Sequence, residues 1–385
     1  MIRRPPRSTR KESSAASDVY KRQIITCSIL GLILTALVLF SKPIIYYMGQ
    51  PEIVVGLAYP YITLVAISLF PLIIFQSFKQ FSDGLSFTKI AMISTVIANI
   101  INIVLNYILI YGEFGFPRLE LIGAGIGTLV SRFIMVIVII YLIKSNVKTN
   151  QYINNIFSFE YSSKIIKKIF NLGYPSALQM MFEVGFFISG IWVCGIIGIN
   201  YQAANQIALN LSSLTFMVAL GLSVAATIRV ANQKGLNDYK NLKRIAISIF
   251  LITIFIEFVF ALIFIIFSDL LPWLYLDSNG SSDVLETVTL ASKLLIVVAL
   301  FQIFDGIQIV AQGALRGIQD VKIPSIICFL SYVAFGIPIM IYLGLYTELK
   351  VTGVWIGFLI GLLIASILHS IRFFKKCNFE INRSI

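Results

Sequence analysis

Long runs of apolar residues, separated by short polar segments, dominate the chain from Ile24 onward. A transmembrane helix needs about 20 mostly apolar residues, and most of these runs reach or exceed that length. They lack the strict alternation of apolar and polar positions that is typical of barrel strands. The pattern predicts ten transmembrane helices, at residues 24–40, 53–78, 90–111, 122–143, 169–199, 203–228, 245–271, 285–312, 323–345 and 351–371.

Composition agrees with an all-α integral membrane protein. The 385 residues are 58% hydrophobic and 12% charged, with a mean hydropathy of +0.90. Soluble proteins carry about 25% charged residues, so this chain has too little polar surface for a soluble enzyme, a secreted disulfide scaffold or a disordered protein. The four cysteines are scattered and there is one histidine, His369. This leaves no pattern for a His-based metal site or a catalytic triad, and we expect neither an enzyme nor a cofactor.

The positive charges alternate along the chain in the way that membrane topology requires. The segments 79–89, 144–168, 229–244, 313–322 and 372–385 together hold 18 Lys and Arg residues. The intervening loops hold only Lys42, Arg118 and Lys350. Since Lys and Arg collect in cytoplasmic loops, the pattern predicts a cytoplasmic C-terminus. The net charge of +12 therefore indicates topology and not nucleic-acid binding.

Residues 1–23 differ from the rest of the chain. They contain seven Lys and Arg, two acids and no apolar run. A signal peptide needs an apolar core of about 7–15 residues, so this segment is not one. It resembles translated sequencing-adapter read-through, and we interpret it as a non-native leader. The alternative is a basic, disordered tail.

An internal repeat connects the two halves of the chain. The segment 75–89, followed by the Gly-rich run 123–127, resembles 311–322 followed by 353–357. Glycines at this spacing let helices approach closely. The copies share one orientation across the predicted membrane, so the repeat is parallel. Internal repeats of this kind are typical of transporters.

The repeat also predicts the organisation of the lobes. Spans 169–199 and 203–228 have no counterpart before Ile24, so we expect two pseudo-symmetric six-helix lobes and a chain that is truncated upstream. The expected division is a first lobe at 24–145 with four of its six helices, a cytoplasmic linker at 146–165, and a second lobe at 166–385 with six helices and a cytoplasmic tail.

Three acids fall well inside predicted spans: Glu183, Glu257 and Asp305. A charged group at mid-membrane costs about 3 kcal/mol on insertion scales, so such acids usually face a cavity or a partner. Glu183 and Asp305 lie at similar depths relative to Lys168 and Arg316, and we expect them to share one site. Two carboxylates raise one another's proton affinity and are oxygen ligands suited to a small cation such as Na⁺. For Glu257 we expect a local structural role or snorkelling.

Amide side chains mark two further spans. Asn102 and Asn106 are four residues apart and share a helix face, and Gln206 and Asn210 have the same spacing. They are candidates for lining a polar cavity. Interhelical hydrogen bonding is the alternative role.

At these residues the chain resembles the multidrug and toxic compound extrusion (MATE) family, in its bacterial NorM-like branch. The matching motifs occur in family order and cover essentially residues 24–375. They are NIVLNYILIYGEFGFP (102–117), IGAGIGT (122–128), LGYPSALQMMFE (172–183), QIALNLSSLTFM (206–217), FDGIQIVAQGALRGIQD (304–320) and GVWIG (353–357).

The resemblance implies a twelve-helix secondary antiporter of the bacterial inner membrane that works by alternating access. It would export organic cations and drugs in exchange for Na⁺ or H⁺, as a monomer. Glu183 and Asp305 match acids implicated in cation coupling and cargo binding. Asn102 and Asn106 match polar positions of the first lobe. Some relatives carry an aspartate where Asn106 stands, which weakens a proton site there and leaves the coupling ion open.

Three other functions fit the sequence less well. A lipid-linked oligosaccharide flippase of the same superfamily would need a strongly basic cavity, whereas Arg132 and Lys293 are the only cations inside spans. A membrane-embedded prenyltransferase would need paired aspartate motifs, and the acidic segment 277–286 lacks them. A channel fits poorly with acids that are confined to one repeat.

Overall fold

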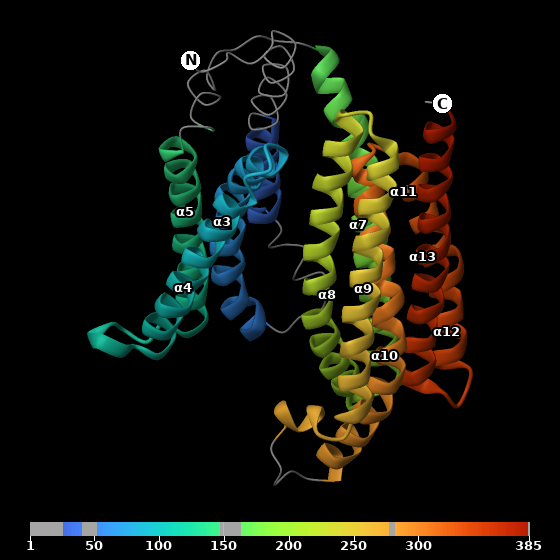
Figure 1. Cartoon of the computed structure of the whole chain (residues 1–385). Coiled ribbons are helices and arrows are strands. Elements are labelled where there is room, and N and C mark those ends of the chain that lie inside the picture. Colours follow the sequence, from blue (N-terminus) through green and yellow to red (C-terminus); the bar gives the residue numbers. More distant parts are fainter. Residues whose placement is uncertain (1–25, 41–51, 147–148, 150–162, 277–281, 384–385) are drawn as a thin grey trace. The chain divides into compact units, whose positions relative to one another are not determined.

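The structure is a computed structural model that describes residues 26–40, 52–146, 149, 163–276 and 282–383 (Figure 1). All regular elements in this part of the chain are helical. The longer ones are α3 (Glu52–Gly84), α4 (Thr88–Tyr111), α5 (Glu120–Ser145), α7 (Ser163–Ile197), α8 (Ile199–Gly235), α9 (Tyr239–Ile266), α10 (Ser282–Gly317) and α13 (Lys350–Arg383). The shorter ones are η1 (Glu113–Gly115), η2 (Leu271–Leu274), α11 (Lys322–Cys328), η3 (Phe329–Gly336) and α12 (Ile337–Leu345).

The predicted all-α membrane fold is confirmed. Among the described residues, nine helical segments are long and apolar enough to cross a membrane. A tenth apolar helix, Thr26–Leu39, is shorter and falls within the predicted span 24–40. Several helices continue beyond the predicted spans, as α8 does at its C-terminal end. A helix satisfies its own backbone hydrogen bonds, so it need not stop where the apolar run stops.

The span predicted at 323–345 is less regular than its sequence indicates. It consists of α11, the π-helical stretch η3 and α12 in succession. The wider π turn brings Ser331 and Tyr332 into the protein interior, where both are fully buried. Local π-helical turns occur frequently at functional sites, and this one lies near the acids described below.

The chain divides into two compact units, residues 1–169 and 170–385. The predicted lobe boundary at 145–166 lies just before this division, and the lobe assignment itself stays a prediction. The leader predicted at 1–23 lies outside the described residues. So does most of the linker predicted at 146–165.

Helix α10 is the central element of the second unit. It packs against α8, α9 and α13, and most of its membrane-spanning window is buried inside the protein. Small residues such as Gly306, Gly313 and Gly317 allow these close approaches, because a Cβ at Gly317 would lie 2.8 Å from a backbone oxygen of α8. Protein therefore encloses four polar side chains in the second half of this helix, Gln302, Asp305, Gln308 and Gln312.

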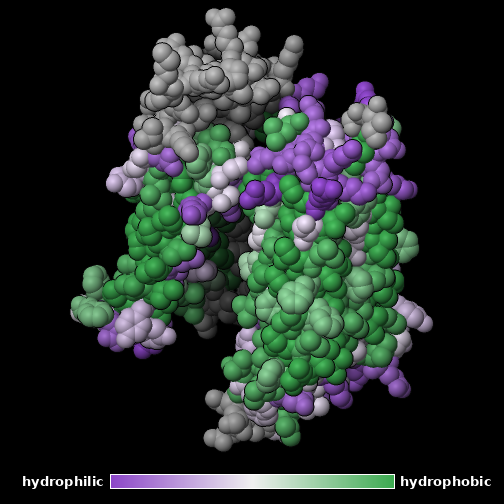
Figure 2. Space-filling view, in the orientation of Figure 1, coloured by the Kyte–Doolittle hydropathy of each residue, from purple (hydrophilic) through white to green (hydrophobic). Residues whose placement is uncertain are grey.

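The surface of the second unit separates apolar and charged regions. Figure 2 shows hydrophobic side chains over its middle and hydrophilic ones gathered at the upper end. That end carries the α8–α9 and α10–α11 connections and the C-terminal end of α13 (Figure 1). Exposed cations there include Lys240, Arg244 and Lys375. This distribution supports the predicted topology, in which these loops share one side of the membrane.

The internal repeat is confirmed at the level of local backbone structure. Helix α5 and helix α13 begin at Glu120 and Lys350, which have nearly equal positive φ angles of 49° and 48°. A Cβ at Gly123 would lie 2.7 Å from the carbonyl oxygen of Leu109, and one at Gly353 would lie 2.5 Å from that of Leu343. The two glycines thus make the same helix contact in each copy.

Two turns show how individual residues of the copies correspond. The turn after α3 has a left-handed residue at Ser86, and the turn after α10 has one at Gln319. Matching these turns pairs Asp83 with Arg316, so Asp83 and Asp320 do not correspond.

Candidate functional site

Three helices of the second unit bring carboxylates together inside the membrane-spanning region. Asp305 of α10 is 5% exposed, and its Oδ1 has no hydrogen-bond partner among the described residues. It lies within electrostatic range of Glu183 on α7 and Glu257 on α9. Glu183 and Asp305 thus influence one another electrostatically, and the prediction that they share one site stays a prediction. Their role in ion coupling stays a prediction.

Glu257 is the residue whose environment the sequence misjudged. Its side chain is 1% exposed, so the snorkelling interpretation is wrong. Neither carboxylate oxygen has a hydrogen-bond partner in the described part of the chain. A Cβ at Gly306 would lie 2.7 Å from Glu257 Cγ, which shows that the acid occupies the space left by this glycine. The sequence does not show that α9 packs on α10 at Gly306, and the local structural role of Glu257 stays a prediction.

Uncharged polar groups surround these acids. Gln302 donates from Nε2 to the backbone oxygen of Glu257 at 3.3 Å, while its own Oε1 is unpaired. Gln308 and Tyr332 are fully buried, and their side-chain polar atoms have no partners among the described residues. Unpaired buried polar groups are costly, so such a cluster is expected where a function needs it. Carboxylate and amide oxygens suit a proton or a small hard cation.

The acids do not form a multi-carboxylate metal centre. Within the described ranges, no three His, Cys, Asp or Glu side chains come close enough to hold one metal ion. A Na⁺ ion at Glu183 or Asp305 would therefore need amide, hydroxyl or backbone oxygens as its other ligands. Such oxygens are carried by Gln302 and Gln308, which lie about one helical turn before and after Asp305 on α10. Tyr332 carries another and interacts with Asp305 electrostatically.

The first unit contains a separate amide cluster between α4 and α5. Asn106 Nδ2 donates to Asn102 Oδ1 at 3.2 Å, which confirms that the two residues share a face. Asn102 Nδ2 lies 3.4 Å from Ser131 Oγ, and Asn106 packs over Gly127. Interhelical hydrogen bonding thus accounts for Asn102. Asn106 Oδ1 is buried without a partner in the part of the chain that the structure describes.

The amides predicted on α8 point away from the core of the second unit. Gln206 and Asn210 are both exposed, and Asn210 Nδ2 donates to the backbone oxygen of Gln206 at 3.0 Å. The buried amide of this helix is Asn205, which sequence reasoning missed. Its Oδ1 accepts from Trp355 Nε1 at 3.0 Å. A cavity-lining role for Gln206 and Asn210 stays a prediction.

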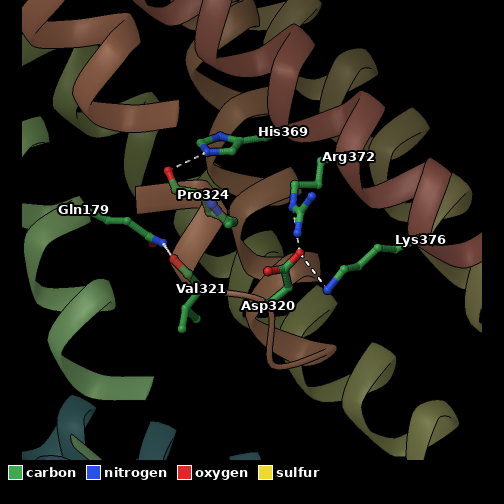
Figure 3. A network of polar contacts seen from close by, with 7 residues as sticks. All are labelled: Gln179, Asp320, Val321, Pro324, His369, Arg372 and Lys376. Atoms are coloured by element: carbon green, nitrogen blue, oxygen red, sulfur yellow. Dashed lines mark hydrogen bonds and ion pairs between the residues drawn. The ribbon is translucent and has the colours of Figure 1, made fainter. Parts of the chain in front are cut away.

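A polar network connects helices at the end of the second unit that carries the C-terminus (Figure 3). Asp320 accepts from Arg372 Nε at 2.8 Å and pairs with Lys376 Nζ at 2.9 Å, which joins the α10–α11 connection to α13. Gln179 Nε2 of α7 donates to the backbone oxygen of Val321 at 2.9 Å. These contacts fix α7 and α13 to the connection that follows α10.

Comparisons with known proteins agree with this arrangement. The MatE family model matches residues 9–108 and 175–342. The chain is 31% identical over 344 residues to the Probable multidrug resistance protein NorM of Rhizobium meliloti, with 89% of the chain and 73% of that protein covered. It is 31% identical over 372 residues to the protein of the same name from Bacillus thuringiensis, with 96% of the chain and 80% of the relative covered.

The fold has a close counterpart among solved structures. A structure described as the outward-facing conformation of a multidrug resistance MATE family transporter of the MOP superfamily is similar, with a TM-score of 0.83 at 22% identity. The match covers 96% of this chain and 83% of the solved one.

Proposed function

Because the chain belongs to the MatE family of membrane transporters, we propose that it exports organic cations and drugs in exchange for Na⁺ or H⁺. It is a multi-pass membrane protein and a transporter, not an enzyme. The names of its relatives, multidrug resistance proteins, support a cargo of drug size. The pair of acids inside the second unit supports a cationic one.

The observation that carries this proposal is the state of Asp305. A carboxylate that is 5% exposed, has an unpaired oxygen and lies near two other acids is unstable as a bare anion. It therefore needs a proton or a bound cation. A site with this property binds cations and selects against anions.

The need of these carboxylates for a bound cation also explains how a coupling ion could be exchanged for a cargo. A coupling ion and a cationic cargo that compete for Glu183 and Asp305 cannot both be bound with full affinity. Arrival of Na⁺ or H⁺ from outside then favours loss of the cargo, and the reverse holds on the inner side. Alternating access of the site to the two sides turns this competition into net export.

We also propose the orientation and setting of the protein. The cation-rich end of the second unit, with Lys240, Arg244 and Lys375, lies in the cytoplasm. The C-terminus is then cytoplasmic, in the inner membrane of a bacterium. The division into lobes at 24–145 and 166–385, joined by the linker at 146–165, belongs to the same proposal. The protein acts as a monomer, which light scattering of the detergent-purified chain would check.

The test is ethidium efflux from drug-sensitive bacterial cells that express the chain. We expect Glu183→Gln and Asp305→Asn each to abolish efflux without loss of membrane expression. Glu286→Gln is the matched control, because this acid lies at the exposed end of α10 and bonds Asn200 at 2.7 Å. Normal efflux by both site variants would contradict the assignment of these acids.

Proteoliposomes then identify the coupling ion and the cargo class. Efflux that follows an imposed Na⁺ gradient without a pH gradient indicates sodium coupling, and the opposite dependence indicates protons. The competing function is flipping of a lipid-linked oligosaccharide. Movement of a fluorescent lipid-linked sugar without any cation transport would favour that alternative and refute the antiporter proposal.

A further inference from the structure

Arg316 lies in the last turn of α10, and its side chain is only partly exposed. Its Nη2 donates to Gln312 Oε1, one turn back along the helix. Side chains on a helix lean toward its N-terminus, and here that direction leads into the membrane-spanning interior. Its Nε is buried without a hydrogen-bond partner among the described residues. Arginines near membrane boundaries usually reach outward instead.

Glu183 on α7 lies at about the same depth in the membrane-spanning region as the side chain of Arg316 on α10. Gln179 bonds to Val321, which places this level of α7 beside the connection after α10. Glu183 follows one helical turn deeper, about 6 Å along the axis. Arg316 is directed to the same depth by its bond to Gln312. The two charges attract each other electrostatically, but no ion pair within 4.0 Å joins them.

Further polar contacts position Gln312, the hydrogen-bond partner of Arg316. Gln312 Nε2 lies 3.6 Å from Cys328 Sγ, and Cys328 Sγ lies 3.9 Å from His369 Nε2. His369 Nε2 is also 3.3 Å from the carbonyl oxygen of Pro324 (Figure 3). The guanidinium is thus tethered to Gln312 rather than paired with Glu183, and its buried Nε–H has no partner among the described residues.

We propose that Arg316 competes with the transported cation for Glu183. Its fixed positive charge weakens cation binding to this carboxylate and promotes release of the cation toward the end of the second unit that carries the C-terminus. This inference rests on the proposed function, because it presupposes that Glu183 binds the transported cations. The physical need is clear. A carboxylate shielded from water holds a cation tightly, and an exchanger must release that cation in every cycle.

The test measures cation binding to the purified full chain in detergent, with radioactive sodium and with tetraphenylphosphonium as separate probes. Arg316→Gln removes one unit charge near the carboxylate, and we expect it to tighten binding of at least one probe roughly tenfold. Arg316→Lys keeps the charge and should stay close to the unchanged chain. Arg372→Gln, which removes a cation paired with Asp320 instead, is the matched control and should not alter affinity.

For a second variant, the proposal predicts a change of cation affinity in the opposite direction. Gln312→Leu removes the acceptor that holds the guanidinium, so Arg316 is free to pair with Glu183. We expect cation binding to weaken severalfold in this variant. This measurement keeps the proposal testable if Arg316→Gln does not fold.

A double-mutant cycle separates the inference from the proposed function. The inference predicts that Arg316→Gln has no effect on affinity in a Glu183→Gln background. If Glu183→Gln weakens binding while Arg316→Gln and Gln312→Leu change nothing, Glu183 binds cations and the competitor role is refuted. If neither Glu183→Gln nor Asp305→Asn changes binding, the proposed function fails, and the inference fails with it.

Discussion

Replacing Glu257 by Met should stabilise the protein. Both carboxylate oxygens of Glu257 are buried without partners in the described part of the chain, and an unsatisfied buried polar group costs about 1–3 kcal/mol. Methionine has a similar length, adapts to irregular spaces and carries no strong polar group. Changes of shape at constant volume cost up to about 1.5 kcal/mol. The net expectation is a gain of about 1 kcal/mol, or about 2–4 °C in Tm for a domain of this size.

The assay uses the protein's own thiols. Cys194, Cys328 and Cys377 are free and buried, so a thiol-reactive fluorophore labels them when the second unit unfolds. Heating the detergent-purified protein with this reagent gives the transition temperature. Leu251→Met is the control on the same helix, because Leu251 is 62% exposed and should leave the transition unchanged.

One partner substitution sharpens the test. Gly306→Ala places a Cβ 2.7 Å from Glu257 Cγ, and overpacking of this kind costs about 1–3 kcal/mol. In a Glu257→Ala background most of that cost should disappear. A fall of several degrees for Glu257→Met would refute the reasoning, since it would mean that the carboxyl group makes a stabilising contact.

Two further substitutions test other parts of the second unit by the same thermal assay. Asp320→Asn should destabilise the second unit by about 1–2 kcal/mol, because the buried carboxylate loses its charge-assisted bonds to Arg372 and Lys376. The loss stays this small because both partners are partly exposed. An equal loss in an Arg372→Gln background would contradict the coupling of Asp320 to Arg372. Gly353→Ala should cost at least about 2 kcal/mol, because its Cβ would lie 2.5 Å from the carbonyl oxygen of Leu343. Gly221→Ala has open space at its Cβ and should be tolerated, so equal losses for both glycines would refute the close-approach argument.

The sequence by itself determined the fold class and most of the helices. Apolar runs of membrane length admit few structures in lipid, because every backbone polar group must be paired within the segment. The spacing of Asn102 and Asn106 was also sufficient to predict that they lie together, since residues four apart on one helix share a face. The glycine spacing of the repeat predicted close helix contacts, and Gly123 and Gly353 make equivalent ones.

Only the tertiary structure decided which polar groups meet. Glu257 and Asp305 are 48 positions apart in the sequence, and their proximity depends on α9 packing against Gly306 of α10. Helical periodicity indicates that Asn205 and Gln206 lie on different faces of α8, but not which face is buried. In membrane helices both faces are apolar, so the hydrophobic pattern that reveals the inner face of a soluble helix is absent. Side-chain packing between helices therefore decides where a buried charge lies and what it touches.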